Sequence, residues 1–379
     1  MVPRSDRALT TAPVSTWVVT FTPNELVEKM ARVAHHGWYD PMKEAAPLAT
    51  NRVITPRSRL AVGFDSQTIT SRSLVPMDHS TARRATLTAT ALGTERYLLA
   101  EGPQINPYDG TLSWVDIEAG TIHVGRVHAD GMFEQVRVIE VPDRVGCAFP
   151  LEGGGFLAGV GRRLAVIDVH GDIVFSGDLI DNGRRFNDGV IDPAGRLLIG
   201  SLSLEGEPTG NVLLRLESDG SVTTLDNDLL LANGLGFSPD GTTLYLVDSL
   251  ARTLCARDYD ANGMSTGPRQ TLARFDGCEP DGLAVDQAGD IWVALWRGHG
   301  IRRFSPDGTA RGDTILGPPH VTSLCFFTDG SGRALVTTAS LALTPEGRKR
   351  HPEAGMVAIV NLGVNGRTVH RWRRVPLPT

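Results

Sequence analysis

The sequence contains few cysteines and no long apolar segment. Its 379 residues include four cysteines, and none of them belongs to a Cys-x-x-Cys pair, which excludes the common zinc-ribbon and thioredoxin-type motifs. No run of about 18 apolar residues is present, so we expect no membrane-spanning helix. The first 22 residues lack the apolar stretch of a secretory signal. We therefore predict a reduced, cytoplasmic protein that does not associate with membranes.

Positive charge is also scarce. The 37 Lys and Arg residues are outnumbered by 43 Asp and Glu residues, which gives a formal net charge of -6. This acidic balance argues against a nucleic-acid partner or an anionic membrane surface. Glycine and proline, by contrast, are abundant, with 42 and 23 residues. This composition favours a β protein rich in turns over a helical bundle.

A turn that ends in glycine and leads directly into an apolar, β-rich strand occurs six times. The six marker glycines are Gly110, Gly155, Gly195, Gly241, Gly289 and Gly332. Successive markers are 40 to 48 residues apart. A period of about 40 to 50 residues with several short strands per unit is typical of a β-propeller, in which each unit forms one four-stranded blade. Six units predict an all-β, six-bladed propeller over residues 86–379.

Residues 1–85 contain no copy of this repeat, and we interpret them as an N-terminal extension. Thr22, Pro23 and Glu25 form a capping-box pattern, which predicts a short helix over about residues 23–36. The rest of the extension is expected to be irregular. Residues 86–100 resemble a strand pair that closes the ring, and no helical periodicity is found from residue 100 onward.

One position in each unit is expected to face the central channel. It lies eight or nine residues before each marker glycine and is occupied by Glu101, Cys147, Asn187, Asn233, Asp281 and Ser323. Since the innermost strand of each propeller blade runs along the channel, these six residues should form a ring. Two carboxylates in a partly dry channel repel each other unless a cation is present. Oxygen ligands suit Ca²⁺, Mg²⁺ or Mn²⁺, and the absence of histidine from the ring weighs against a typical zinc site.

Each ring residue also has a simpler interpretation. Asn, Asp and Ser before glycine are common in loops, so any one of them alone would be assigned to turn chemistry. Arg185, two residues before Asn187, is either a ligand for a polar substrate or a solvated loop residue. His320, just before the sixth inner strand, is expected in a surface loop, with a place at the channel mouth as the alternative. The Gly-x-Ser-x-Gly spacing at residues 263–267 falls between two strands, and a nucleophile elbow requires a strand–turn–helix context, so we reject it.

Five segments occur in the order and spacing of one known family: EGPQINPYDGTLSWVDIEAGTIH, RRFNDGVIDPAGRLLIGS, NGLGFSPDGTTLYLVDS, PDGLAVDQAGDIWVALW and RHPEAGMVAIV. Over about residues 95–368 the chain resembles the senescence marker protein/gluconolactonase family, also called regucalcin-like. This resemblance implies a six-bladed propeller with one divalent metal in its channel. The implied metal ligands are Glu101, Asn233 and Asp281, and the implied substrate contacts are Arg185, Asn187 and Glu205.

The sequence departs from the family pattern at the substrate side of the channel. Ile105 stands where the family often has an aromatic residue, and the loop at residues 201–208 reads SLSLEGEP where a Gly-Thr-Met start is usual. Because these residues line the substrate mouth in the family, the departures concern the choice of substrate and leave the implied metal ligands unchanged.

The expected function is metal-dependent hydrolysis of a lactone similar to a sugar lactone, with Asp281 as general base. Calcium is the expected cation, with manganese, magnesium, zinc or iron as alternatives. The same site would also suit ester or organophosphate hydrolysis, or a ring-opening or rearrangement step in a specialised biosynthetic pathway. A third possibility is a non-enzymatic propeller that only binds metal. The expected partner is a small-molecule substrate, and the protein is expected to be a monomer or a homodimer.

Overall fold

The computed structural model describes residues 16–19, 87–205, 208–262 and 266–379. By its internal contacts the chain divides into one unit formed by residues 1–20 and 86–379 and another formed by residues 21–85. The helix expected over residues 23–36 lies outside the described residues. All strands and helices below belong to the first unit.

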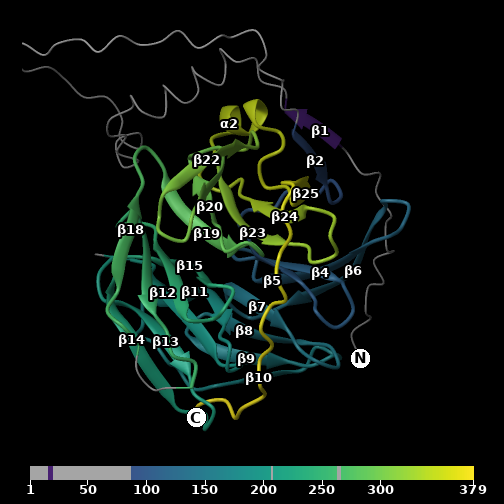
Figure 1. Cartoon of the computed structure of the whole chain (residues 1–379). Coiled ribbons are helices and arrows are strands. Elements are labelled where there is room, and N and C mark those ends of the chain that lie inside the picture. Colours follow the sequence, from purple (N-terminus) through teal and green to yellow (C-terminus); the bar gives the residue numbers. More distant parts are fainter. Residues whose placement is uncertain (1–15, 20–86, 206–207, 263–265) are drawn as a thin grey trace, which may run out of the picture. The chain divides into compact units, whose positions relative to one another are not determined.

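Six antiparallel sheets form the propeller that the repeat predicts (Figure 1). The first blade contains β3 (Ala100–Ile105), β4 (Leu112–Asp116), β5 (Thr121–Val127) and β6 (Phe133–Glu140). The second contains β7 (Val145–Pro150), β8 (Phe156–Val160), β9 (Arg163–Ile167) and β10 (Ile173–Phe175). The third contains β11 (Arg184–Ile191), β12 (Leu197–Ser203), β13 (Asn211–Leu216) and β14 (Val222–Leu229). The fourth contains β15 (Ala232–Phe237), β16 (Thr243–Asp248), β17 (Thr253–Asp258) and β18 (Gln270–Arg274). The fifth contains β19 (Glu279–Val285), β20 (Ile291–Trp296), β21 (Gly300–Phe304) and β22 (Ala310–Ile315).

The sixth blade is assembled from both ends of the chain. Its inner strands β23 (Val321–Phe326), β24 (Arg333–Thr338) and β25 (Ala358–Asn361) come from the C-terminal part. Strand β2 (Leu87–Ala91) pairs with β25, and β1 (Thr16–Val19) pairs with β2 as the outermost strand. The ring is thus closed by hydrogen bonds between strands far apart in sequence.

The first strand of each blade lies at the centre. Strands β3, β7, β11, β15, β19 and β23 contact one another in turn and complete a closed ring. The turns that follow them contain the marker glycines, whose φ angles are all positive, from 71° at Gly332 to 92° at Gly289. This region of φ is readily accessible only to glycine, which explains why glycine marks the repeat. Apolar clusters fill the space between neighbouring blades; Trp292, for example, meets Phe326 of the next blade edge to face at 5.7 Å.

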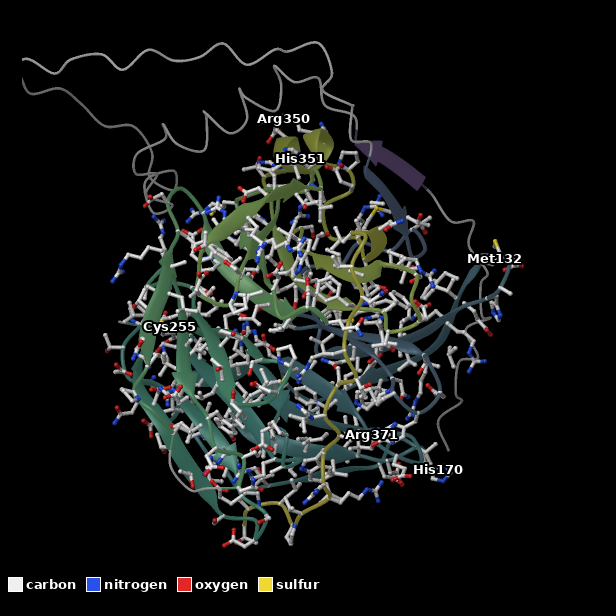
Figure 2. All side chains as sticks on the ribbon, in the orientation of Figure 1. Met132, His170, Cys255, Arg350, His351 and Arg371 are labelled. Atoms are coloured by element: carbon white, nitrogen blue, oxygen red, sulfur yellow. The ribbon has the colours of Figure 1, made fainter. Side chains whose placement is uncertain are left out.

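One short helix was not expected. Helix α2 (Pro345–Arg350) lies in the connection between β24 and β25, in the part of the chain where the sequence shows no helical periodicity. Its local signals are clear in retrospect: Thr344 accepts a hydrogen bond from the Gly347 backbone N–H as N-cap, and Pro345 follows at the first helical turn. Figure 2 labels Arg350 at its end and His351 just after it. With six residues it is too short to show a helical period.

The C-terminal segment after β25 crosses the face of the propeller at which the inner strands end (Figure 1). Along its path it hydrogen-bonds to the turns of successive blades, including those at Phe327, Gln287, Ser238 and Gly195. Trp372 of this segment is buried against the second and third blades. Arg371, labelled in Figure 2, places its guanidinium over the ring of Tyr108 at 4.5 Å.

All four cysteines are free. In the part of the chain that the structure describes, no helix is long and apolar enough to cross a membrane.

Candidate active site in the propeller channel

Every inner strand is irregular at or next to its ring position. The register with the second strand shifts between Glu101 and Gln104, Val145 and Cys147, Phe186 and Gly189, Ala232 and Leu235, Pro280 and Leu283, and Val321 and Ser323. A β-bulge bends its strand and changes the direction in which a side chain points. Six bulges at one level of the channel therefore produce a ring of side chains that regular strands would not present together.

Three oxygen-bearing residues of the ring interact directly. Asn233 donates a hydrogen bond from Nδ2 to Oδ1 of Asp281 and another, of 3.1 Å, to the Ser249 hydroxyl. The carboxylates of Glu101 and Asp281 lie close enough to share a hydrogen bond. All three side chains are buried, with 6 to 7% of their surface exposed. Two inner strands of adjacent blades, β15 and β19, and the more distant β3 thus contribute to one cluster.

Burial dominates the electrostatics of this cluster. Loss of water raises the pKa of Glu101 well above its ordinary value, and the charges of Asp281 and Asp188 raise it further. Burial likewise raises the pKa of Asp281, while the hydrogen bond from Asn233 partly opposes that shift. Asp188, which the sequence analysis did not select, has a pKa raised to about 6 by burial. Without a cation, ionising all three carboxylates would be costly.

Arg185 and Asn187 lie beside these carboxylates on β11. The Arg185 guanidinium donates from Nη1 to Asn187 Oδ1 at 2.8 Å and to the Phe186 carbonyl at 2.9 Å. Asn187 in turn donates to the Ala232 carbonyl at 3.0 Å. Arg185 is 6% exposed, and its Nε has no hydrogen-bond partner among the described residues. A buried N–H of a guanidinium without an acceptor is costly, so this donor is available to a polar ligand.

Glu205 is separated from this cluster. It follows β12 in an exposed loop on the side of the propeller where β11 begins, as the hydrogen bond from Leu204 N to Gly183 O shows. No hydrogen bond or ion pair of the described residues joins it to Arg185 or Asn187. The structure thus brings Glu101, Asn187, Asn233, Asp281 and Arg185 together and leaves Glu205 at the rim.

Glycines let the inner strands approach closely at this level. A Cβ on Gly234 would lie 2.6 Å from both the Asp281 carbonyl oxygen and the Leu283 nitrogen, and a Cβ on Gly282 would lie 2.2 Å from the Ser323 hydroxyl. These atoms belong to the next inner strand, so any side chain there would push neighbouring blades apart. The glycine after a ring residue therefore sets the spacing of the cluster.

His320 corrects an expectation. It was expected in a surface loop, but it is 5% exposed and stacks on Trp296 at 4.0 Å with nearly parallel rings. The bridge between Trp296 and His320 joins the fifth blade to the sixth. Burial lowers the pKa of His320 to about 4, so the imidazole is neutral at neutral pH.

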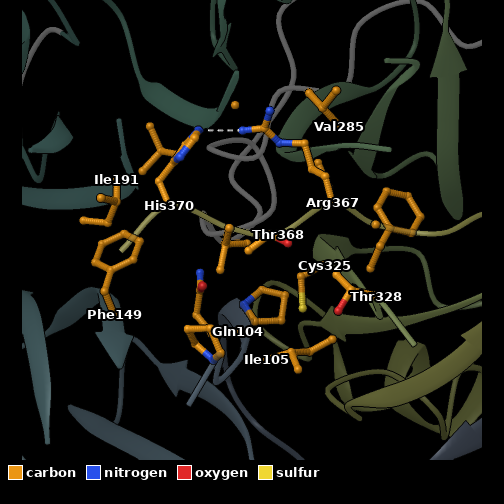
Figure 3. Close-up of a pocket in the computed structure, with 18 of the residues that line it drawn as sticks. Gln104, Ile105, Phe149, Ile191, Val285, Cys325, Thr328, Arg367, Thr368 and His370 are labelled. Atoms are coloured by element: carbon orange, nitrogen blue, oxygen red, sulfur yellow. Dashed lines mark hydrogen bonds between the residues drawn. The ribbon is translucent and has the colours of Figure 1, made fainter. Parts of the chain in front are cut away.

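A cavity of about 630 Å³ lies between the inner strands and the C-terminal segment (Figure 3). Gly102, Asp188 and Ser323 line it at the level of the ring, but Glu101, Asn233 and Asp281 do not. Phe149, Ile191 and Val285 form much of its wall, and the C-terminal segment contributes Arg367, Thr368 and His370 (Figure 3). Arg367 donates to the Ser238 carbonyl at 2.7 Å and contacts His370 Nε2. The C-terminal segment thus covers part of the channel opening that lies away from the carboxylates.

Comparison with known proteins decides the family. A family model described as the SMP-30/Gluconolactonase/LRE-like region matches residues 99–340. The chain belongs to this family. It is 31% identical over 280 residues to regucalcin of Danio rerio, covering 72% of this chain and 94% of the relative.

Two further members of the SMP-30/gluconolactonase family illustrate its range. The chain is 33% identical over 243 residues to pentonolactonase XacC of Haloferax volcanii, covering 64% of this chain and 81% of that protein. The crystal structure of a calcium-binding regucalcin from Agrobacterium tumefaciens superposes with a TM-score of 0.69 at 28% identity, covering 75% of this chain and 97% of that chain. The family relationship agrees with the resemblance found in the sequence.

The channel ring of this SMP-30/gluconolactonase propeller contains few side chains that could bind a cation. Among the described residues, no group of three or more His, Cys, Asp and Glu side chains is arranged to hold a metal. The ring instead combines two carboxylates with the amide of Asn233, whose oxygen accepts from the Gly234 N–H at 3.1 Å. Carboxylate and amide oxygens are ligands that hard cations such as Ca²⁺ accept, with water completing the shell.

Proposed function

We propose that this protein is a metal-dependent hydrolase that opens a lactone, with a divalent cation held by Glu101, Asn233 and Asp281. The observation that carries the proposal is the contact between two buried carboxylates, Glu101 and Asp281, beside a third at Asp188. Such an arrangement is unfavourable for the protein alone and becomes favourable when a cation neutralises it. Calcium is the first candidate, because the donors are all oxygen atoms.

The relatives support the choice of reaction. One related protein is named a pentonolactonase and another a calcium-binding regucalcin. A lactone is a cyclic ester, so its hydrolysis needs a nucleophile, a group that accepts a proton and stabilisation of negative charge on the carbonyl oxygen. When bound, the cation would act as a Lewis acid that stabilises this charge.

The residues of the chain would supply the remaining functions. Asp281 would accept a proton from the attacking water as a bond forms between the water oxygen and the carbonyl carbon. The bond from that carbon to the ring oxygen then breaks, and Asp281 would return the proton to the ring oxygen. The free Nε of Arg185 would donate to a substrate oxygen. Asn187 would act chiefly by orienting Arg185 through their 2.8 Å hydrogen bond, and Glu205 would contact the substrate from the rim.

The proposal is tested with chelated protein to which Ca²⁺, Mn²⁺, Mg²⁺ or Zn²⁺ is restored. Hydrolysis of a panel of aldonolactones would be followed with a pH indicator and corrected for spontaneous opening. We expect activity only with metal, and Asp281→Asn should lower kcat/KM by about 10²- to 10⁴-fold, the usual contribution of a general base. Calorimetry should also show weaker metal binding in this variant.

Aryl esters and phosphotriesters assayed in parallel separate the alternatives. Faster turnover of either class than of any lactone would assign the same site to another reaction. Stoichiometric metal binding with no turnover of any of the three classes would contradict the proposal and favour a metal-binding propeller. Full activity of Asp281→Asn would remove Asp281 from the mechanism.

A further inference from the structure

Two arginines converge on one carboxylate close to Asp281. Strand β19 begins at Glu279, two residues before Asp281. The Glu279 carboxylate accepts hydrogen bonds from Arg297 Nε at 2.8 Å, from Arg297 Nη2, and from Arg252 Nη2 at 2.7 Å. Arg252 lies in the turn between β16 and β17, and Arg297 lies in the turn between β20 and β21. Both turns are therefore on the side of the propeller where the inner strands begin.

This rim carries more positive than negative charge. Glu279 is 8% exposed and neutralises one guanidinium, whereas the Arg252 and Arg297 side chains are 47% and 46% exposed. Each guanidinium has five N–H donors, and Glu279 uses one of Arg252 and two of Arg297. The two arginines thus present a net positive charge and unused N–H donors to solvent. The Glu279 carboxylate holds both guanidinium groups in place.

The backbone at both arginines is in an unfavourable conformation. Arg252 has φ 54° and Arg297 has φ 64°, and they are two of only four non-glycine residues with positive φ among the described residues. This conformation is unfavourable for a residue with a side chain, because its Cβ approaches the following carbonyl oxygen. Strain of this kind persists where the surrounding structure enforces it, and it is frequent at ligand sites. Glycine would relieve it at both positions, but it would remove the guanidinium.

An aromatic surface adjoins the pair. Trp296 is paired directly with Glu279 across the strands β19 and β20 and precedes Arg297. Its ring stacks on His320, whose Nδ1 is buried and has no hydrogen-bond partner in the described part of the chain. Trp296 therefore lies beside the carboxylate that holds both arginines, and its own position is fixed by stacking on the buried His320.

We propose that Arg252 and Arg297 bind an anionic group on the substrate, so that the preferred lactone carries a second acid function. This inference rests on the proposed function of the channel site. Two residues of a strand span about 7 Å, which is the spacing of Glu279 and Asp281 along the backbone of β19. The carboxylate that holds both guanidinium groups thus begins the strand that carries Asp281, and a lactone whose carbonyl lies near Asp281 would direct its acid group toward this end of β19. Arginine is suited to this role because its planar fork matches a carboxylate, phosphate or sulfonate.

The test compares lactones that share a ring and differ in charge. Glucono-δ-lactone is the neutral probe, glucarolactone carries a carboxylate, and 6-phosphogluconolactone carries a phosphate. The ratio of kcat/KM for the two charged lactones shows which anion is preferred. We expect higher kcat/KM for a charged lactone in the wild type. Combined Arg252→Gln and Arg297→Gln should lower kcat/KM for the charged lactones about 10- to 100-fold and for the neutral one by less than about threefold, mainly through KM.

Arg302→Gln is the matched control. Arg302 lies in the same blade as Arg297, pairs with Asp313 on β22, and its loss makes the same change in charge as each single substitution of the pair. It should leave the ratio of charged to neutral substrate unchanged. Arg252→Lys with Arg297→Lys should retain part of the preference, because the charge remains while the fork is lost.

Failure of the subsite is distinguishable from failure of the proposed reaction. If the wild type hydrolyses neutral lactones and the double glutamine variant leaves the substrate ratio unchanged, the subsite is refuted and the reaction stands. If no lactone is hydrolysed, calorimetry with glucarate and gluconate tests the subsite directly. Tighter binding of glucarate, lost in the double variant but not in Arg302→Gln, would support it, and equal binding of both acids would refute it.

Discussion

Asn233 donates a hydrogen bond to Asp281, which lies 48 residues later on the inner strand of the next blade. The bond connects β15 to β19 at the level of their bulges, and Asn233 is itself held by Ser249. A hydrogen bond to a carboxylate favours its ionised form, so Asn233 opposes the burial that would keep Asp281 protonated. The amide therefore tunes the carboxylate that we assign as general base.

The carboxylate cluster should make the metal-free protein less stable as the pH rises. The pKa of Asp281 is raised to about 8, and that of Glu101 is raised as well, so the folded state binds more protons than the unfolded state between about pH 4 and pH 8. The contribution of these two carboxylates to stability is then largest below about pH 4 and falls through that window. Glu101→Gln should flatten this dependence and raise the Tm of chelated protein at pH 8, while weakening metal binding. Thermal unfolding of the wild type and of Glu101→Gln, both with chelator, at pH 5 and pH 8 measures this dependence. An equal change in Tm between the two pH values in both proteins would contradict the role of the carboxylate cluster.

His123 should destabilise the fold in acid. It is buried in the first blade, stacks parallel to Trp114 and hydrogen-bonds to the Thr121 hydroxyl at 2.9 Å. Burial lowers its pKa to about 4, so between about pH 6.5 and pH 4 the unfolded chain binds the additional proton and stability falls as the pH falls. At pH 5 the effect is roughly 2 kcal/mol relative to pH 7. Urea unfolding should show that His123→Gln loses less free energy of unfolding between pH 7 and pH 5 than the wild type does. His320, with a similarly lowered pKa, accounts for part of the loss that remains in the variant.

Gly234 should tolerate no side chain. A Cβ there would contact backbone atoms of β19 at 2.6 Å, and backbone can move away only by separating two blades. We expect Gly234→Ala to cost about 3 kcal/mol, the upper range for overpacking, and to displace Asp281, which lowers metal affinity. Gly131→Ala is the control: its φ of 84° carries a backbone penalty, but nothing lies within 4 Å of the added Cβ. Metal affinity should be unchanged in that variant. Chemical unfolding measures the stability of both variants, and calorimetry measures their metal affinity. Equal metal affinity in the two variants would contradict the prediction.

The C-terminal segment should contribute strongly to stability through one side chain. Trp372 is 8% exposed and packs in the cluster between the second and third blades. Trp372→Ala should cost about 3–5 kcal/mol, as for other buried aromatic residues. Val369, on the same segment, is 44% exposed, and its replacement by Ala should change stability by less than about 1 kcal/mol. Denaturant titrations that gave the two variants equal stability would show that the segment is not part of the cooperative fold.

The repeat made the fold and much of the candidate site accessible from sequence. Glycine with positive φ is required at every marker turn, such as Gly110 and Gly289, and this local requirement is written directly into the chain. Because the blades repeat, counting back from these glycines also located Glu101 and Asp281 at one level of the channel. The resemblance to the SMP-30/gluconolactonase family added Arg185, which the repeat alone did not select.

Other features depended on contacts between distant segments. The burial that shifts the pKa of Asp188, the stacking of His320 on Trp296 and the convergence of Arg252 and Arg297 on Glu279 join residues of different turns or blades. No local pattern encodes such contacts, since each depends on how neighbouring blades pack. The sequence alone therefore determined the number of blades and the ring positions, through backbone requirements that repeat along the chain. Only the tertiary structure decided which charges are buried, which are paired and which remain exposed at the rim, because burial and pairing are properties of the assembled ring.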